Sequence, residues 1–286
     1  PMSSTAKASR AQQARRTLNH VVPSVLKAST RARDGVASAK LLQQLAPNLA
    51  QPTADAPRQT VINVVAHDTL QTAYKLMTHS QGARIAILSK ASELRPGGGF
   101  LSGASSQEES LCMRTTLYPS LRDEFYRLPE KGCVYTPDVC VFRGTYTPES
   151  SGDLTTDMTV KSPSEWWFID VISCAAIRSP DLDDTGAQYA DAAQCDLTYD
   201  KVKQILRAAA MHGCRYLVLG AFGCGAFSNP PQQVAKIFRR ALLGKDHRKP
   251  GEFAGYFDEI VFAIKGGKSE SIKAFQDAFM GHDNPT

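Results

Sequence analysis

Two neighbouring carboxylates stand at a predicted helix start, a short distance after a run of glycine. The residues in question are Gly97, Gly98, Gly99, Gln107, Glu108 and Glu109. Consecutive glycines allow positive φ and let the backbone approach a ligand closely, and amides at a helix start can hold an anion. Adjacent helical residues point about 100° apart. We therefore expect one Glu to bind a hydroxyl group and the other to transfer a proton.

A structural role is the alternative for the same segment. Ser106 and Glu109 have the spacing of a capping box, in which both side chains would only satisfy the helix N-terminus. Capping explains neither the three glycines nor Gln107, so the sequence pattern leaves both interpretations open.

A second glycine-rich turn follows the apolar run 215–222, which predicts a strand. The turn consists of Gly223, Cys224, Gly225, Ala226 and Phe227. Ligands of α/β proteins bind at the carboxyl ends of strands. The turn lacks the Gly-Lys-Ser/Thr of a P-loop and the GxGxxG of a dinucleotide site. It is therefore either a binding turn of another kind or a tight structural turn, with Phe227 against a ligand or in the core.

The remaining reactive residues form no recognisable centre. His67 and Asp68 follow the first predicted strand, where they could act as acid and base, or as a loop residue and a helix N-cap. The seven cysteines are odd in number and include no CxxC, and no His pair has the spacing of zinc ligands. We expect reduced, mostly buried thiols, no metal site and no cofactor.

Composition and charge narrow the class of protein. Of the 286 residues, 42% are hydrophobic and 21% charged, as in ordinary globular proteins. No apolar run approaches the roughly 18 residues that span a bilayer, and no apolar secretory signal opens the chain. We therefore expect an intracellular protein, cytoplasmic or nuclear, without a membrane partner.

The basic charge is concentrated at the N-terminus. Residues 1–60 hold nine Lys/Arg and two Asp/Glu. A nucleic-acid-binding protein would spread basic residues over its folded face. The basic segment is therefore either a solvated arm or a contact for a polyanion, and we expect no obligatory nucleic-acid partner.

The pattern of apolar runs predicts an α/β domain with a mostly parallel or mixed sheet, because short buried strands alternate with helices. Residues 1–59 are predicted to be a helical extension, broken near Pro23 and ended by Pro47, with a linker from 47. Residues 60–286 are predicted to be the catalytic domain. Expected helices are 7–20, 35–46, 69–79, 107–126, 198–213, 231–243 and 268–280; expected strands are 61–66, 84–89, 133–143, 166–174, 215–222 and 259–264; expected loops are 144–165 and 179–196.

The two glycine-rich segments together resemble a known family. The spacing from Gly97–Gly99 to Gln107–Glu109 resembles the signature of poly(ADP-ribose) glycohydrolases. The longer string PGGGFLSGASSQEESL is similar to the bacterial and fungal branch of that family. Residues 135–143 and 212–227 are similar to further blocks, in the expected order. The resemblance covers roughly residues 60 to 280.

Membership would imply a macrodomain-like, three-layer α/β/α fold with a mixed central sheet and an N-terminal helical extension. It would also imply hydrolysis of the ribose–ribose O-glycosidic bonds of poly(ADP-ribose), releasing ADP-ribose without a metal or cofactor. By motif position, Glu109 would be the catalytic acid/base, while Glu108 and Gln107 hold the ribose and support the loop. Gly97–Gly99 would shape the pocket. The turn 223–227 would bind the diphosphate, with Phe227 orienting the terminal ribose.

The resemblance also implies partners and alternatives. Its partners would be poly(ADP-ribose), ADP-ribose and poly(ADP-ribosyl)ated proteins. The protein would be a monomer that reverses ADP-ribosylation in the DNA damage response. One departure is Ser89-Lys90, where the microbial branch commonly has Asn-Phe. The alternatives are an enzyme removing single ADP-ribose units from protein or nucleic acid, and a non-catalytic ADP-ribose reader. The intact Glu108-Glu109 pair argues against the reader.

Overall fold

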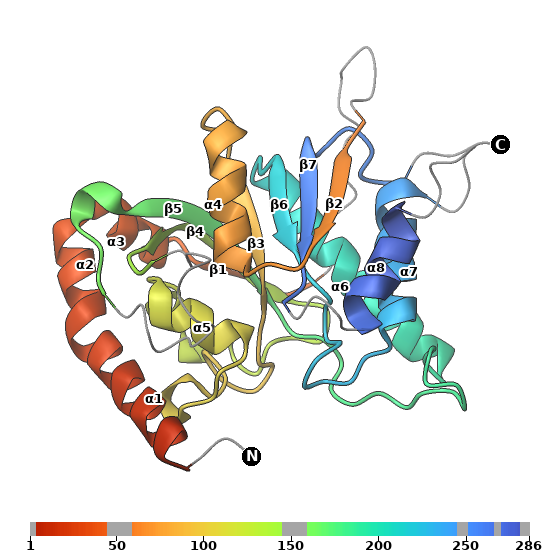
Figure 1. Ribbon diagram of the computed structural model, residues 1–286, viewed down its shortest axis with the longest axis horizontal. Helices are drawn as coiled ribbons and strands as arrows, with labels where there is room; N and C mark the ends of the chain where they lie inside the picture. Colours follow the sequence, from red (N-terminus) through yellow and green to blue (C-terminus); the bar gives the residue numbers. More distant parts are fainter. Residues whose placement is uncertain (1–3, 45–58, 145–158, 245–250, 266–269, 281–286) are drawn as a thin grey trace.

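A mixed sheet of seven strands forms the centre of the protein, in the order β1-β4-β5-β3-β6-β7-β2 (Figure 1). The structure is a computed structural model and describes residues 4–44, 59–144, 159–244, 251–265 and 270–280. The strands are β1 (Lys40–Leu42), β2 (Val61–Val65), β3 (Ile85–Lys90), β4 (Cys133–Val141), β5 (Trp167–Cys174), β6 (Tyr216–Leu219) and β7 (Glu259–Ala263).

The sheet has a parallel part and an antiparallel edge. The strands β5, β3, β6, β7 and β2 run parallel to one another. β4 pairs antiparallel with β5, and β1 pairs antiparallel with β4. Parallel strands need crossover helices, which the segments between them supply. The mixed sheet predicted from the alternation of apolar runs is confirmed.

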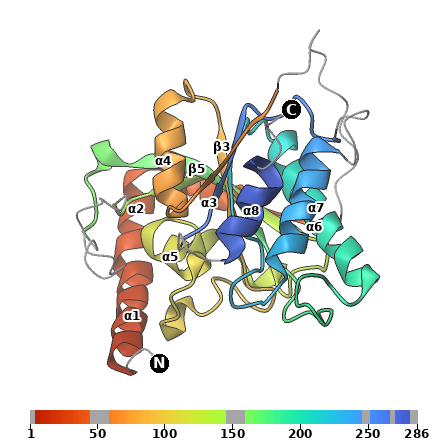
Figure 2. The same ribbon diagram turned by 45° about the vertical axis from the view of Figure 1, so that its right-hand side comes forward.

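Helices cover both faces of the sheet, so the protein has three layers (Figure 2). α4 (Thr69–His79) and α5 (Gln107–Arg114) pack on one face; α6 (Ala192–Met211), α7 (Pro231–Leu243) and α8 (Glu270–Met280) pack on the other. Alternate residues of β3 serve the two faces, because successive strand side chains point in opposite directions. Ile87 packs in the core under α4 and α5, and Leu88 packs in the core under α6, α7 and α8. None of the described helices is long and apolar enough to cross a membrane.

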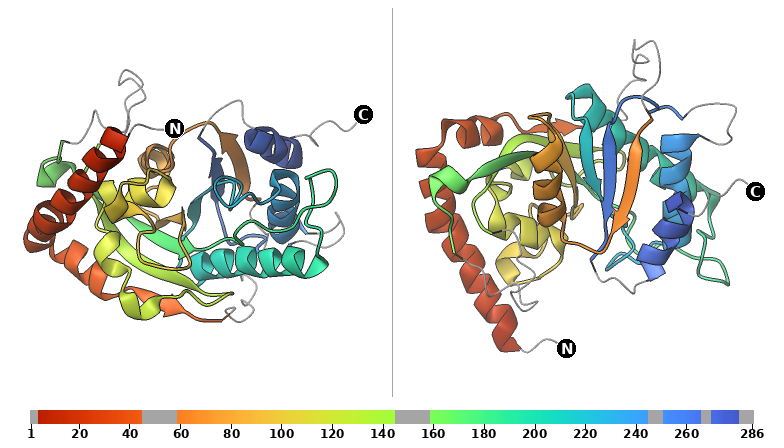
Figure 3. Two further views of the ribbon diagram at one scale, coloured as in Figure 1. Left: turned by 90° about the horizontal axis from the view of Figure 1, so that it is seen from below. Right: turned by 45° about the horizontal axis from the view of Figure 1, so that its top comes forward.

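The N-terminal segment is helical and lies along the antiparallel edge (Figure 3). It contains α1 (Ser4–Arg16), a π-helical stretch (Thr17–Val21), α2 (Val22–Ala28) and α3 (Thr30–Ala37). The break expected near Pro23 is wrong. Pro23 sits in the first turn of α2, where its missing N–H costs little, and the chain breaks instead at Ser29, which caps α3.

Three predicted elements differ from the structure. The expected helix 35–46 is wrong, because residues 40–42 form β1 and pair with β4. The expected helix 107–126 ends at Arg114, where Thr115 and Thr116 turn to bond with β4. The expected loop 179–196 gives way to α6 at residue 192, because Asp191 caps that helix. The expected linker 47–59 and most of the expected loop 144–165 lie outside the described residues, and the division at residue 59 stays a prediction.

Asp68 ties α4 to α5 and is not free to act as an acid or base. Its Oδ1 accepts hydrogen bonds from the amides of Leu70 and Gln71, as an N-cap does. Its Oδ2 lies 2.9 Å from a guanidinium nitrogen of Arg114, at the last turn of α5. Burial opposes ionisation, but Arg114 and the two amides lower the pKa of Asp68 below its ordinary value. The N-cap interpretation of Asp68 is therefore confirmed.

Asp68→Ala is expected to lower the free energy of unfolding by about 3 kcal/mol, because it removes a helix cap and leaves Arg114 without its carboxylate. The control Asp191→Ala removes only an exposed cap and should cost about 1 kcal/mol. Urea unfolding at neutral pH measures both. Equal losses would show that the Asp68–Arg114 pair adds nothing to the cap.

Candidate active site

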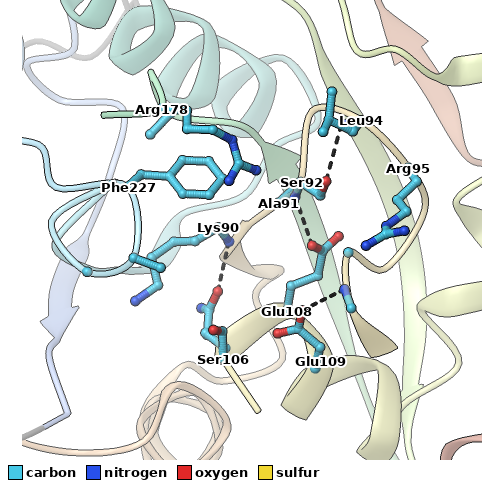
Figure 4. A pocket seen from close by; sticks show the side chains of 17 residues that line it. Lys90, Ala91, Ser92, Leu94, Arg95, Ser106, Glu108, Glu109, Arg178 and Phe227 are labelled. Carbon is cyan, nitrogen blue, oxygen red and sulfur yellow. Dashed lines mark hydrogen bonds between the residues drawn. The ribbon is translucent and has the colours of Figure 1, made fainter. Parts of the chain in front are cut away.

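A cavity of about 390 Å³ opens at the carboxyl ends of three neighbouring parallel strands, β5, β3 and β6. This is the sheet edge at which α/β proteins bind ligands. The cavity is lined by Lys90, Ala91, Ser92, Leu94, Arg95, Gly98, Gly99, Ser106, Gln107, Glu108, Glu109, Ala176, Arg178, Gly223, Gly225, Ala226 and Phe227. Figure 4 shows Phe227 and Arg178 on one wall and the two Glu side chains on the other. The topology thus brings the two glycine-rich segments together.

The glycine run packs directly onto both carboxylates. Gly97 and Gly98 have φ of +62° and +54°, a region that side-chain-bearing residues rarely adopt. A Cβ on Gly98 would lie 2.9 Å from Oε2 of Glu108 and 2.9 Å from Oε1 of Glu109. A Cβ on Gly97 would collide with the ring of Tyr118. The loop therefore needs glycine for its conformation and for its contact with the acidic pair.

Glu109 is buried and keeps one oxygen free. Its Oε1 accepts a hydrogen bond of 2.8 Å from the amide of Gly99, and its Oε2 has no partner among the described residues. The hydroxyl of Ser106 forms no cap hydrogen bond with α5. The capping-box alternative is therefore wrong, because Glu109 bonds to the glycine loop instead.

Glu108 is arranged in the same way at the neighbouring position. Its Oε2 accepts a hydrogen bond of 2.8 Å from the amide of Ser92, and its Oε1 has no partner within the described segments. Burial raises the pKa of Glu108 to about 8, although the Ser92 amide opposes this, and the neighbouring Glu109 charge raises it further. Glu108 is therefore largely protonated at neutral pH.

Gln107 joins α5 to the end of β3. Its Oε1 accepts from the amide of Lys90 at 2.7 Å, and its Nε2 donates to the carbonyl of Leu88 at 2.7 Å. A third bond runs to the hydroxyl of Thr69. Because both ends of the amide are occupied, Gln107 sets the position of the first turn of α5 and hence of both acids.

The second glycine-rich turn is held by a buried amide side chain. Asn229 donates to the carbonyl oxygens of Ile177, Gly223 and Phe227, which joins the turn to the segment after β5. A Cβ on Gly223 would come within 2.6 Å of Ala176, and Gly223 has φ +75°. The guanidinium of Arg178 lies 4.3 Å from the ring centre of Phe227.

The N-terminal helix braces the loop that carries the glycine run. Arg10 in α1 donates from Nε to the carbonyl of Gly103 at 2.9 Å. Gly103 has φ +81°, and any Cβ there would collide with the carbonyl of Lys7. The loop that presents the Gly99 amide to Glu109 is thus packed between α1 and α5.

Nine of the eleven residues predicted for the site line this cavity. The other two do not line it: Gly97 packs against the ring of Tyr118, and the thiol of Cys224 donates to the carbonyl of Phe222. Their roles toward a ligand stay predictions. Sequence reasoning did not assign Ser92, Arg95 or Arg178 to the site. Arg178 follows the end of β5, and a position just beyond a buried parallel strand was the signal for it. Among the described residues, no group of three His, Cys, Asp or Glu is placed to hold a metal ion.

Comparisons with known proteins show which family and fold this chain resembles. The model of the microbial-type PARG catalytic domain (PARG denotes poly(ADP-ribose) glycohydrolase) matches residues 11–144. That range begins within α1, so the resemblance extends further toward the N-terminus than the expected residue 60. A comparison with curated protein sequences finds no match.

Solved structures extend the likeness over nearly the whole chain. The PARG of Thermomonospora curvata has a TM-score of 0.76 and 29% identity, covering 95% of this chain and 100% of its own. The same protein bound to the inhibitor ADP-HPD has a TM-score of 0.72 and 27% identity, with the same coverage. The PARG of Deinococcus radiodurans in complex with ADP-ribose has a TM-score of 0.63 and 24% identity, covering 87% of this chain and 97% of its own. At that identity the last likeness concerns the fold alone. The expected macrodomain-like fold is confirmed.

The raised pKa of Glu108 predicts a pH-dependent stability. Because the folded protein holds a proton on Glu108 up to about pH 8, whereas an unfolded Glu loses it near 4.5, stability falls as pH rises between these values. Between pH 5 and pH 8 the free energy of unfolding should decrease more for the wild type than for Glu108→Gln, and the difference should reach up to about 4 kcal/mol. The exposed control Glu124→Gln should follow the wild type, and identical pH dependence of Glu108→Gln and wild type would contradict a protonated Glu108.

Proposed function

We propose that this chain, which matches the model of the microbial-type PARG catalytic domain over residues 11–144 and is similar in structure to a bacterial PARG, hydrolyses the ribose–ribose O-glycosidic bonds of poly(ADP-ribose) and releases ADP-ribose. The observation that carries the proposal is the pair of buried carboxyl groups at the cavity. Each uses one oxygen to accept a hydrogen bond from a loop amide, and its other oxygen has no partner among the described residues. A buried polar atom without a partner is costly, and a substrate hydroxyl or glycosidic oxygen would satisfy it.

In the proposed mechanism, Glu109 serves as both acid and base. Glycoside cleavage passes through an oxocarbenium-like transition state, and most glycosidases use two separated carboxyl groups. Here Glu109 passes a proton from Oε2 to the departing 2′-hydroxyl oxygen, and the resulting carboxylate then takes a proton from the attacking water. The bond from the Gly99 amide fixes the orientation of the carboxyl group through both steps.

The other residues of the cavity position the substrate. Glu108 is kept neutral by burial, so it can bind a ribose hydroxyl without repelling the carboxylate that Glu109 becomes once it has given up its proton. The amides of the turn 223–227 are suited to the diphosphate, because successive backbone N–H groups in such a turn form an anion site. Phe227, supported by Arg178, orients the terminal ribose.

The proposal extends to the setting in which the enzyme works. Its substrates are polymer chains attached to proteins, and it acts as a monomer in the cytoplasm or nucleus, reversing ADP-ribosylation after DNA damage. The thiols support an intracellular setting: none of the seven cysteines forms a disulfide, and five are buried. Reduced thiols are usual inside cells.

Glu109→Gln should abolish turnover and keep ADP-ribose binding, because the shape of the side chain survives while the proton-transfer group is lost. General acid–base catalysis contributes roughly 10²–10⁴-fold to a rate. Release of ADP-ribose from polymer measures turnover, and calorimetry measures binding; Glu124→Gln is the exposed control. Activity within a few-fold of wild type would reject Glu109 as the acid/base. If the wild type is inactive on polymer but removes single ADP-ribose units from protein or nucleic acid, the alternative enzyme class is favoured.

Phe227→Ala should lower kcat more than it weakens ADP-ribose binding, because misorientation of the bound ribose costs most at the transition state. Phe238→Ala, in the buried core, is the matched control and should cost about 3–5 kcal/mol of stability. Thermal unfolding, ADP-ribose affinity and kcat of both variants separate the two roles. A large drop in Tm for Phe227→Ala with unchanged activity of the folded fraction would make Phe227 a core residue.

A further inference from the structure

Lys90, the last residue of β3, lies where two cavities meet. It lines the 390 Å³ cavity and also a second cavity of about 240 Å³, and Ser106 and Gln107 likewise line both. The second cavity is lined by His67, Asp68, Thr69, Lys90, Ser105, Ser106, Gln107, Ser110, Ala263 and Lys265. If a ligand longer than one nucleoside occupied both cavities, its middle part would lie next to Lys90.

The ammonium group of Lys90 is withdrawn from water and has no anionic partner. Burial lowers the pKa of Lys90 below its ordinary value, although the residue keeps some contact with solvent. Within the described segments of the chain, no carboxylate forms an ion pair with its Nζ. A partly buried, unpaired charge reduces the stability of the free protein. A ligand with a negatively charged group next to Lys90 would therefore stabilise its ammonium group.

The ammonium group faces the glycine-rich turn. A Cβ on Gly220 would lie 3.9 Å from Nζ, and the thiol of Cys224 is the one group whose charge would raise the pKa of Lys90. Figure 4 shows the side chain directed away from Glu108 and Glu109. The backbone of Lys90 is fixed by the 2.7 Å bond from its amide to Gln107. A cation thus lies close to the segment that leads from β6 into the turn 223–227.

We propose that Lys90 binds the diphosphate of the ADP-ribose unit and makes the site selective for ligands that carry a diphosphate. The inference rests on the proposed function. The diphosphate is the anionic middle part of ADP-ribose, which joins its two ribose-bearing halves, and Lys90 stands at the junction of the two cavities. A charge-assisted hydrogen bond is stronger than a neutral one, and the low local dielectric of a partly buried site strengthens it further. Lys90 is a specificity-determining residue and takes no part in proton transfer.

The test compares wild type, Lys90→Met and Lys90→Arg, with the exposed Lys236→Met as a control for net charge. Calorimetry measures the affinity for ADP-ribose and for adenosine, which lacks the diphosphate. We expect Lys90→Met to bind ADP-ribose about 10- to 100-fold more weakly. Lys90→Arg should stay within about threefold of wild type, because it keeps the charge, and Lys236→Met should match wild type. Adenosine affinity should be the same in all four proteins.

Thermal unfolding of the free proteins separates ligand binding from a structural role. Methionine removes an unpaired charge at similar length, so Tm should stay equal or rise. A lower Tm, with ADP-ribose and adenosine affinity weakened together, would overturn the inference. If Lys90→Met does not fold, Lys90→Gln replaces it with the same expectations.

The experiments distinguish failure of the Lys90 inference from failure of the proposed glycohydrolase function. If wild type releases ADP-ribose from polymer and Lys90→Met binds ADP-ribose within threefold of wild type, only the Lys90 inference falls. If wild type binds ADP-ribose with the expected dependence on Lys90 but does not cleave polymer, the diphosphate contact stands and the glycohydrolase function falls. If wild type binds no ADP-ribose, both fall.

Discussion

The burial of two adjacent carboxyl groups is the constraint on which the rest of the structure depends. Glu108 and Glu109 occupy the first turn of α5, each anchored through one oxygen by a backbone amide from the preceding loop. Two negative charges could not share such a site at low cost. The raised pKa of Glu108 and the two amide donors relieve that cost. The positive end of the helix macrodipole at the N-terminus of α5 relieves it further.

Much of the surrounding architecture serves to hold these amides and carboxyl groups in register. Gln107 ties the start of α5 to the end of β3, and the Asp68–Arg114 pair ties its last turn to α4. On the outer side, α1 packs against Gly103 and closes the loop from behind. The basic N-terminal segment is therefore largely structural where it is described. It supports the loop that carries the Gly99 amide.

Charge is divided across the cavity. The two acids lie on one wall, and Lys90, Arg178 and the glycine-rich turn lie on the others. Such a division suits a ligand with neutral hydroxyl groups at one end and an anionic group further along. Among the described residues, Lys90 has no carboxylate partner, and one oxygen of each acid has no hydrogen-bond partner. The free protein thus gives up some stability at the groups that a ligand would satisfy.

The layered α/β class, most element positions and the two glycine-rich segments could be predicted from the sequence, because these follow from local periodicity and from the backbone freedom of glycine. Even α7 is placed at residues 231–243, as the pattern predicts. Three features became visible only in the folded protein: Glu109 accepts a hydrogen bond from Gly99 and does not cap α5, residues 40–42 form a strand, and Arg178 lies over the ring of Phe227. These contacts join residues far apart in the chain or compete with an equally good local partner. The spacing of residues in the sequence cannot show which of two possible contacts forms. The difference in free energy between them comes from burial, which exists only after the sheet has formed.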